Sequence, residues 1–238
     1  MKDIIVYWGI SHLESKAAPR FVEPVSLTSH IFKGKNLKDY GYKACPSFLD
    51  FTNNVFALKS PYKYNFKIND NGDVRSELYD QAFFDTHVLV RSIPSQLFSL
   101  RPFMLFCTEE ESLPMSLEHP WFDNNSYTQR CITIPGQMDI GKYFRSLDFA
   151  FHVNKEFKEF NVEEGDAFYY LRFHTKRKII FKRFMFTLKL LDYSQYVWNI
   201  KESTVKKFKP MEYFYKIYNR YNYKKHIMKE IKENLIEW

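Results

Sequence analysis

The sequence contains little cysteine and gives no sign of a site built from it. Its three cysteines, Cys45, Cys107 and Cys131, are widely spaced and form no CxxC pair. An odd number of scattered cysteines indicates neither a disulfide framework nor a zinc site, and it is typical of a reducing compartment. We therefore expect a cytoplasmic protein in which Cys107 and Cys131 belong to the core.

Long apolar runs are missing too. No window approaches the roughly 18 uncharged apolar residues of a membrane-spanning helix. The apolar start of the chain is broken by Asp3 too early for a signal peptide. The sequence therefore predicts no membrane insertion.

The usual catalytic motifs are absent as well. The chain has no P-loop, GxGxxG, GxSxG or HExxH sequence, and its seven histidines include no pair at i, i+2 or i, i+4. These absences exclude P-loop nucleotide hydrolysis, dinucleotide binding and the usual serine hydrolase, and they predict no metal site and no cofactor. They favour a protein that is not an enzyme.

Aromatic residues, by contrast, are abundant. The chain has 24 Phe and 17 Tyr against 7 Gly, which indicates a core built from large rings on strands. In residues 147–154, large apolar side chains alternate with polar or small ones, so Leu147, Phe149, Phe151 and Val153 should face the core. Residues 167–175 and 179–186 are predicted to complete a three-strand unit, entered through a bend at Gly165 that favours positive φ.

Other strands are predicted at residues 4–8, 55–60, 62–68, 74–78, 86–93 and 100–108. Asn71-Gly72 predicts a tight antiparallel hairpin, because both central residues of a type I′ turn need positive φ. Residues 45–54 are expected to form one or two helical turns with Phe48, Leu49 and Phe51 buried, and residues 113–130 a long loop. His152 and His174 fall on polar strand faces, either as neighbours or as ordinary surface residues.

These elements predict a mainly β fold, antiparallel, either a sandwich or a β-clip-like barrel, with at least eight strands before residue 187. An amphipathic helix should begin at Pro210, following a connection over residues 188–209 that is helical or irregular. We expect a β-rich domain at residues 1–187 and a helical segment at 188–238. The apolar sector of the helix should dock on its own domain or, alternatively, on another protein or a second copy; it comprises Phe214, Ile217, Tyr218, Tyr221, Met228, Ile231, Leu235 and Trp238.

The positive charge is concentrated near the C-terminus. Residues 151–238 carry 19 Lys and Arg against 11 Asp and Glu, a net charge of +8, whereas residues 1–150 carry a net charge of −1. A basic run interleaved with Phe181 and Phe184 predicts an anion-binding or nucleic-acid-binding surface, with a solvated strand face as the alternative. The run comprises Lys176, Arg177, Lys178, Lys182 and Arg183.

Two short segments resemble a known family. Residues 134–141 (IPGQMDIG) and 163–168 (EEGDAF) resemble, in order and spacing, the β-clip fold of dUTPases and dCTP deaminases. The resemblance implies that Asp139 lies near a nucleotide sugar. No glycine-rich Arg-Ser phosphate motif accompanies it, so Asp139 is only a weak catalytic candidate, and we predict no turnover of dUTP or dCTP.

The chain as a whole resembles an uncharacterised class of tailed-phage protein. The resemblance lies in its length and in the layout from IPGQMDIGKYFR to EEGDAFYYLRF, and it implies a location in the host cytoplasm or in the virion. The leading hypothesis is therefore a non-enzymatic viral β-protein that binds a macromolecule, as a virion component or host-directed factor. The alternatives are a nucleotide-binding or nucleotide-hydrolysing protein of β-clip type, and a nucleic-acid-binding protein that uses the basic C-terminal third.

Overall fold

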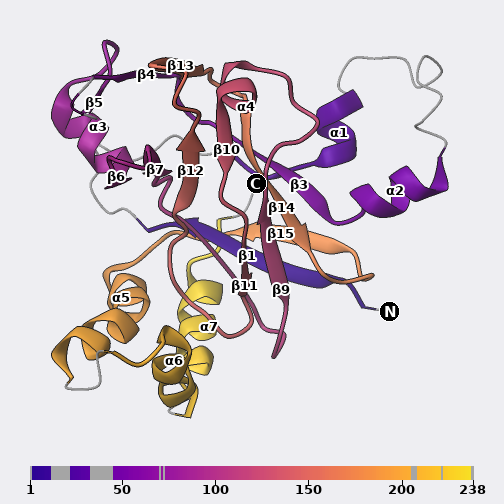
Figure 1. The fold of residues 1–238 in the computed structure, drawn as a ribbon. Coiled ribbons are helices and arrows are strands. Elements are labelled where there is room, and N and C mark those ends of the chain that lie inside the picture. The colour runs from indigo at the N-terminus through magenta and orange to yellow at the C-terminus, as the bar shows by residue number, and fades with distance from the viewer. Residues whose placement is uncertain are drawn as a thin grey trace.

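A computed structural model describes residues 2–11, 22–32, 45–69, 71, 73–204, 208–220 and 222–236, with backbone alone at 217–220. Its strands form four sheets (Figure 1). The first has the order β15 (Ile179–Arg183), β1 (Ile4–Ile10), β8 (Met104–Thr108). The second is β10 (Cys131–Thr133), β12 (Phe149–Val153), β7 (Leu97–Leu100), β6 (Val88–Ser92). The third is β11 (Gly136–Asp139), β9 (Pro114–Glu118), β14 (Ala167–Phe173), β3 (Val55–Lys59), β2 (Val25–Ser26). The fourth is β13 (Glu159–Val162), β4 (Tyr64–Ile68), β5 (Val74–Arg75).

The prediction of many antiparallel strands followed by a C-terminal helix is confirmed. Among the described strand pairs, β1 with β15 is parallel and the others are antiparallel. The closed-barrel alternative is wrong, because the strands divide among four sheets with separate edges. A mainly β description is also too strong, since the described helices hold nearly as many residues as the strands.

The three-strand unit expected at residues 147–186 does not form. Strands β12, β14 and β15 belong to three different sheets. Each was recognisable as a strand, and Leu147, Phe149, Phe151 and Val153 are buried as predicted. Their partners lie far away in the sequence, because β12 pairs with β7, β14 with β3 and β9, and β15 with β1. Sequence order did not indicate these long-range pairings.

Strand β1 separates two hydrophobic cores. Its side chains alternate in direction, so Val6 and Trp8 enter the main core while Tyr7 enters a second core beneath the C-terminal helices. Strand β8 does the same, with Phe106 in the main core and Leu105 in the second. Burial on both faces explains why both strands are apolar at almost every position.

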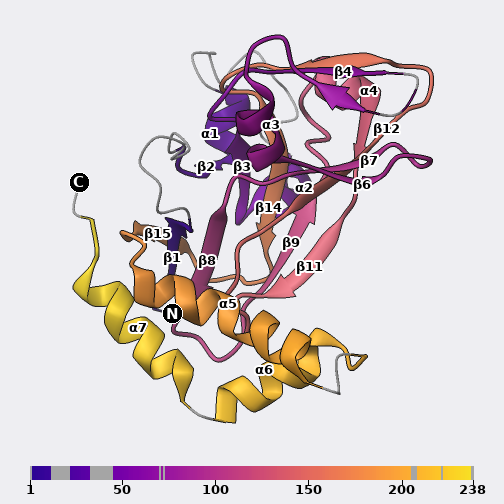
Figure 2. The same ribbon diagram turned by 90° about the vertical axis from the view of Figure 1, so that its left-hand side faces the viewer.

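The C-terminal helices cover the second core. Helices α5 (Leu188–Ser203), α6 (Met211–Arg220) and α7 (Tyr223–Glu233) gather at one end of the molecule, against the sheet that contains β1 (Figures 1 and 2). Phe214 and Ile231 from the predicted apolar sector are buried there. The helix faces therefore pack on this chain's own sheet, and binding of another protein or a second copy through them remains a prediction.

The single helix predicted from Pro210 is two helices. The backbone of Asn222 has φ of +55°, in the left-handed region, which ends α6 and turns the chain into α7. Asparagine tolerates this conformation better than most residues. The described end of the chain then returns to β15, because Met185 N–H donates to the Asn234 carbonyl and Ile236 N–H to the Arg183 carbonyl. The side chains of Ile217, Tyr218, Tyr221 and Trp238 lie outside the described residues.

Several shorter elements also differ from the predictions. The expected loop at residues 113–130 contains β9 and helix α4 (Ser126–Arg130), which a reciprocal cap between Asn125 and Thr128 begins. Helix α3 (Gln81–His87) precedes β6, where a strand was expected from residue 86. In helix α2 (Pro46–Thr52), Leu49 and Phe51 are exposed. Short elements of five to seven residues carry too few side chains to show a period.

Most other local predictions hold. Gly165 has φ of +89°, and Cys107 and Cys131 are buried. Strand β5 returns antiparallel to β4, as predicted. The two-residue turn at Asn71-Gly72 is wrong, because Ile68 lies opposite Val74 and Asn69 N–H donates to the Asp73 carbonyl, a register that leaves three residues between Asn69 and Asp73. Gly72 itself lies outside the described residues. Helix α1 (Leu27–Phe32) lies in a segment whose side chains show neither a helix nor a strand period.

Candidate functional site

A groove runs where the β-rich part meets helices α6 and α7. We call it the lysine groove; its volume is about 750 Å³. One wall comes from the loop after β8 and the segment after β11, the other from α6, the turn at Asn222 and the start of α7. The groove is lined by Glu111, Asp139, Gly141, Lys142, Tyr143, Glu212, Tyr215, Lys216, Asn222, Lys224 and Lys225.

Asp139 lies in this groove, but its carboxylate is fully engaged within the protein. One oxygen accepts the backbone N–H groups of Leu113 at 2.8 Å and Gly141 at 3.0 Å. The other accepts the Ser112 hydroxyl at 2.6 Å and the Lys142 ammonium at 2.8 Å. Burial would raise the pKa of Asp139, but these hydrogen bonds outweigh burial and hold it below its ordinary value. Asp139 therefore stabilises the neighbouring loop that contains Ser112 and Leu113.

Gly141 shows how tightly this loop is held. A Cβ atom on Gly141 would lie 2.7 Å from the Glu110 carbonyl oxygen and 2.9 Å from Ser112 Cα. Such distances are shorter than real Cβ contacts, so only glycine lets the two backbone segments approach this closely. Asp139 and Gly141 together fix the position of the loop over residues 109–112.

Lys224 on α7 attaches the helix to this loop. Its ammonium donates to the backbone oxygen of Glu110 and, at 2.7 Å, to that of Gly141. Burial lowers the pKa of Lys224. Its described acceptors are backbone carbonyls, so this lysine fastens α7 to the β-rich part and also lines the groove.

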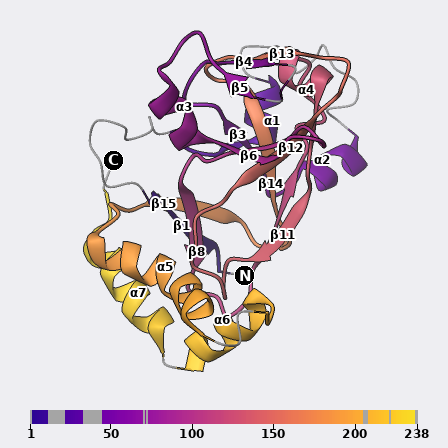
Figure 3. The ribbon, with the colours of Figure 1, turned by 60° about the vertical axis from the view of Figure 1, so that its left-hand side comes forward.

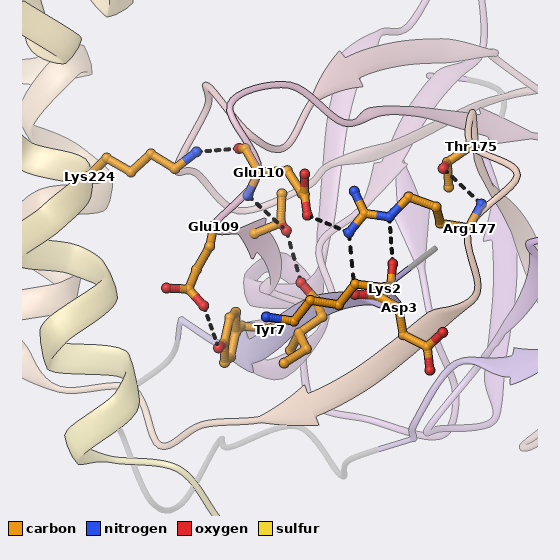
Figure 4. A network of polar contacts seen from close by, with 10 residues as sticks. Lys2, Asp3, Tyr7, Glu109, Glu110, Thr175, Arg177 and Lys224 are labelled. Atoms are coloured by element: carbon orange, nitrogen blue, oxygen red, sulfur yellow. Dashed lines mark hydrogen bonds and ion pairs between the residues drawn. The ribbon is translucent and has the colours of Figure 1, made fainter.

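The three consecutive glutamates of the loop have different surroundings. Figure 4 shows two of these glutamates, Glu109 and Glu110. The Glu109 carboxylate contacts the Tyr7 hydroxyl at 3.3 Å and Lys232 of α7 at 2.5 Å. The Glu110 carboxylate contacts Arg177. The Glu111 side chain lines the groove, with no hydrogen bond or ion pair to any described residue and with an electrostatic effect on Lys224. We call residues 109–111 the acidic loop.

The predicted basic run divides into engaged and exposed residues. Arg177 donates to the backbone oxygen of Lys2 at 2.7 Å and lies 2.9 Å from Glu110 (Figure 4). The guanidinium of Arg183 stacks 5.5 Å from the centre of the Trp8 ring, and burial lowers its pKa. The remaining three, Lys176, Lys178 and Lys182, are exposed. Their binding of anions remains a prediction.

Two more grooves continue the lysine groove at its ends. One, of about 860 Å³, shares Lys224 and Lys225 with it and is lined further along α7 by His226, Lys229 and Lys232. The other, of about 360 Å³, shares Tyr143, Glu212 and Tyr215 and adds Arg91, Arg145 and Met211, among others. Because neighbouring grooves share lining residues, they make one trench along α6 and α7. Figure 3 shows these two helices at the end of the molecule away from β4 and β5.

Most charges in the trench are paired. Lys142 pairs with Asp139, Lys216 with Glu212, Lys229 with Glu233, Lys232 with Glu109 and Arg91 with Asp148. Within the described part of the chain, the side chains of Arg145 and Lys225 make no hydrogen bond or ion pair, and Glu111 is the acidic counterpart. The charged side chains of the trench that have no such partner therefore carry a net positive charge; we call them uncommitted charges.

Sequence reasoning missed this trench. In the single helix that the sequence predicts from Pro210, Lys224 and Lys225 would lie on the apolar side. The break at Asn222 rotates α7 relative to α6 and places both lysines in the groove. Tyr143 and Tyr215, whose rings meet edge to face with centroids 4.6 Å apart, come from segments more than 70 residues apart. A concentration of lysine after residue 200 was the one signal for this site.

The two histidines that the sequence places on strand faces have separate partners. His152, in β12, has Nδ1 3.2 Å from the Gln96 carbonyl oxygen, whereas His174, directly after β14 of another sheet, has Nε2 2.6 Å from the Ser116 hydroxyl. Among the residues that the structure describes, no three His, Cys, Asp or Glu side chains are grouped to hold a metal ion.

No described helix has the length and apolar character needed to cross a membrane.

Comparison of the chain with family models, curated proteins and solved structures found no significant match. The resemblances to β-clip enzymes and to a tailed-phage protein therefore remain predictions.

Proposed function

We propose that the protein is a non-catalytic nucleic-acid-binding protein and that the trench along α6 and α7 holds the phosphate backbone. The proposal corresponds to one alternative from the sequence, a nucleic-acid-binding protein that uses the basic C-terminal third. The observation that carries it is the presence of uncommitted cations, Lys225 and Arg145, in connected grooves beside the Tyr143–Tyr215 pair.

The chemistry of the trench suits a polyanion. Phosphate groups release counterions when lysine and arginine neutralise them, which favours binding without sequence preference. Aromatic rings beside such cations stack on bases. Tyr143 is partly exposed and lines two of the grooves, which gives a base a ring to contact.

Titration of a labelled single-stranded oligonucleotide of about 16 nucleotides, followed by anisotropy at several salt concentrations, tests the proposal. Lys225→Ala should weaken binding and reduce the slope of log affinity against log salt by about 0.7, the value for one phosphate contact on a single strand. The matched control is Lys155→Ala, in the turn between β12 and β13, which should leave the slope unchanged.

Two outcomes contradict the proposal. One is no binding by the wild-type protein even at low salt. The other is binding that the Lys225→Ala and Arg145→Ala variants keep, but that replacement of Lys176, Lys178 and Lys182 removes. That second result would place the nucleic acid on the predicted basic run of β15.

A further inference from the structure

We infer that the trench selects single-stranded over double-stranded nucleic acid and that Glu111 is a residue that sets this selectivity. The inference rests on the proposed function, because it concerns the form of nucleic acid that the same trench accepts. It follows from the opposite character of the two walls of the lysine groove.

The helix wall carries positive charge. Lys216, Lys224 and Lys225 line it against one acidic residue, Glu212, which pairs with Lys216. Lys225 has no hydrogen bond or ion pair to a described residue. A phosphate backbone in the groove therefore lies against α7 and the end of α6.

The opposite wall carries an uncommitted negative charge. Glu111 extends from the acidic loop into the groove, and its exposed carboxylate makes no hydrogen bond or ion pair within the described residues. Asp139 and Gly141 fix the backbone of this loop, so the wall cannot withdraw to admit a second negatively charged strand.

The two forms of nucleic acid meet this wall differently. A duplex carries phosphates on both strands, so seating one backbone on the lysines brings the other towards Glu111, and like charges placed together cost free energy. A single strand has one backbone, and its bases present N–H donors that a carboxylate accepts. A repulsive group of this kind rejects the competing ligand even where it adds no contact to the preferred one.

The experiment compares a single strand and the matching duplex by anisotropy, in the wild-type protein and in Glu111→Gln. The wild type should bind the single strand about tenfold or more tightly than the duplex. Glu111→Gln should raise duplex affinity more than single-strand affinity, so the ratio of single-strand to duplex affinity should fall. Because Glu111 is exposed and its side chain makes no hydrogen bond or ion pair to a described residue, the variant should fold normally, which circular dichroism checks.

The matched control is Glu77→Gln. Glu77 pairs with Lys67 and follows β5 in the sequence. Strand β5 lies at the opposite end of the molecule from α7 (Figure 3). This variant should leave both affinities unchanged. Equal or tighter duplex binding by the wild type, or an equal gain for both ligands in Glu111→Gln, overturns the selectivity while leaving the proposed function standing. Failure to bind either ligand overturns both.

Discussion

The guanidinium of Arg177 lies 2.9 Å from the carboxylate of Glu110, and the same side chain donates to two carbonyls at the start of the chain. The central residue of the predicted basic run therefore joins the β14–β15 turn to the acidic loop and to residues 2–3. Arg177 therefore has a structural role. The sequence alone could not show this, because a solvent-exposed arginine that binds phosphate and an arginine that forms internal hydrogen bonds look the same in a run of basic residues.

Arg177→Met should destabilise the protein and leave nucleic-acid affinity unchanged. The variant removes charge-assisted hydrogen bonds and leaves Glu110 without its partner, so the free energy of unfolding should fall by about 1–3 kcal/mol. Urea unfolding measures this, and Lys176→Met, at an exposed neighbouring residue, is the control. Unchanged stability with a loss of affinity would assign Arg177 to a binding surface instead.

Asp139→Asn should destabilise the protein in a pH-dependent way. The pKa of Asp139 in the folded protein lies below its ordinary value of 3.8. A carboxyl group with a lowered folded-state pKa stabilises the fold above its unfolded-state pKa, and this contribution is lost as pH falls through the folded-state pKa. The stability difference from wild type should therefore be full near neutral pH, at about 1–3 kcal/mol, and shrink below about pH 4.

Urea unfolding of both proteins at several pH values checks this. A stability difference that stays constant from neutral to acidic pH would show that the carboxylate is not the stabilising group. Because the carboxylate is saturated by four internal donors, the wild type should not turn over dUTP or dCTP. Turnover that Asp139→Asn abolishes would restore the enzyme hypothesis.

The sequence predicted individual strands better than their assembly. Alternation in residues 149–153 marks a strand because one face is buried and the other is partly exposed. Strand β14 is the central strand of its sheet, and nearly all of its side chains are buried. Its apolar run therefore shows where a strand lies but not which strands flank it. Pairing depends on contacts between distant segments, which no local pattern contains.

The candidate site was harder to predict for the same reason. Asp139 was singled out because its segment resembles one of the β-clip fold. Gly141 and Lys142 are close to it in the sequence, but its other two partners, Ser112 and Leu113, lie 26 or more residues away. The lysine groove depends on one backbone angle, the positive φ of Asn222, which sets the direction of α7. No period in the sequence marks that angle, and a single continuous helix would have placed Lys224 and Lys225 differently.

Ile231→Ala should cost about 2–5 kcal/mol of unfolding free energy, the range for large-to-small changes in a core. Ile231 on α7 is fully buried in the second core, the cluster to which Tyr7 and Leu105 of the sheet also belong. His226→Ala, at an exposed position of the same helix, is the matched control and should cost little. A loss below about 0.5 kcal/mol for Ile231→Ala would show that α7 contributes little to the fold.

The three cysteines give a probe of whether α7 opens. Cys45 is exposed, whereas burial raises the pKa of both the Cys107 and Cys131 thiols. Since the thiolate is the reactive form, a thiol reagent should modify Cys45 rapidly and the other two slowly in the native protein. Cys107 lies in the second core and lines a small cavity with Ile227 and Met228 of α7, whereas Cys131 lies in the main core.

Detachment of α7 should therefore expose Cys107 and leave Cys131 protected. In Ile231→Ala the modification rate of Cys107 should rise about tenfold or more, because a destabilised helix opens more often, while that of Cys131 rises less. Peptide mass spectrometry after timed labelling distinguishes the two sites. Equal acceleration at Cys107 and Cys131 would mean that the helices and the β-rich part open together, as one cooperative unit. Saturating single-stranded nucleic acid in the trench should slow labelling of Cys107, because a ligand that binds the closed form stabilises it.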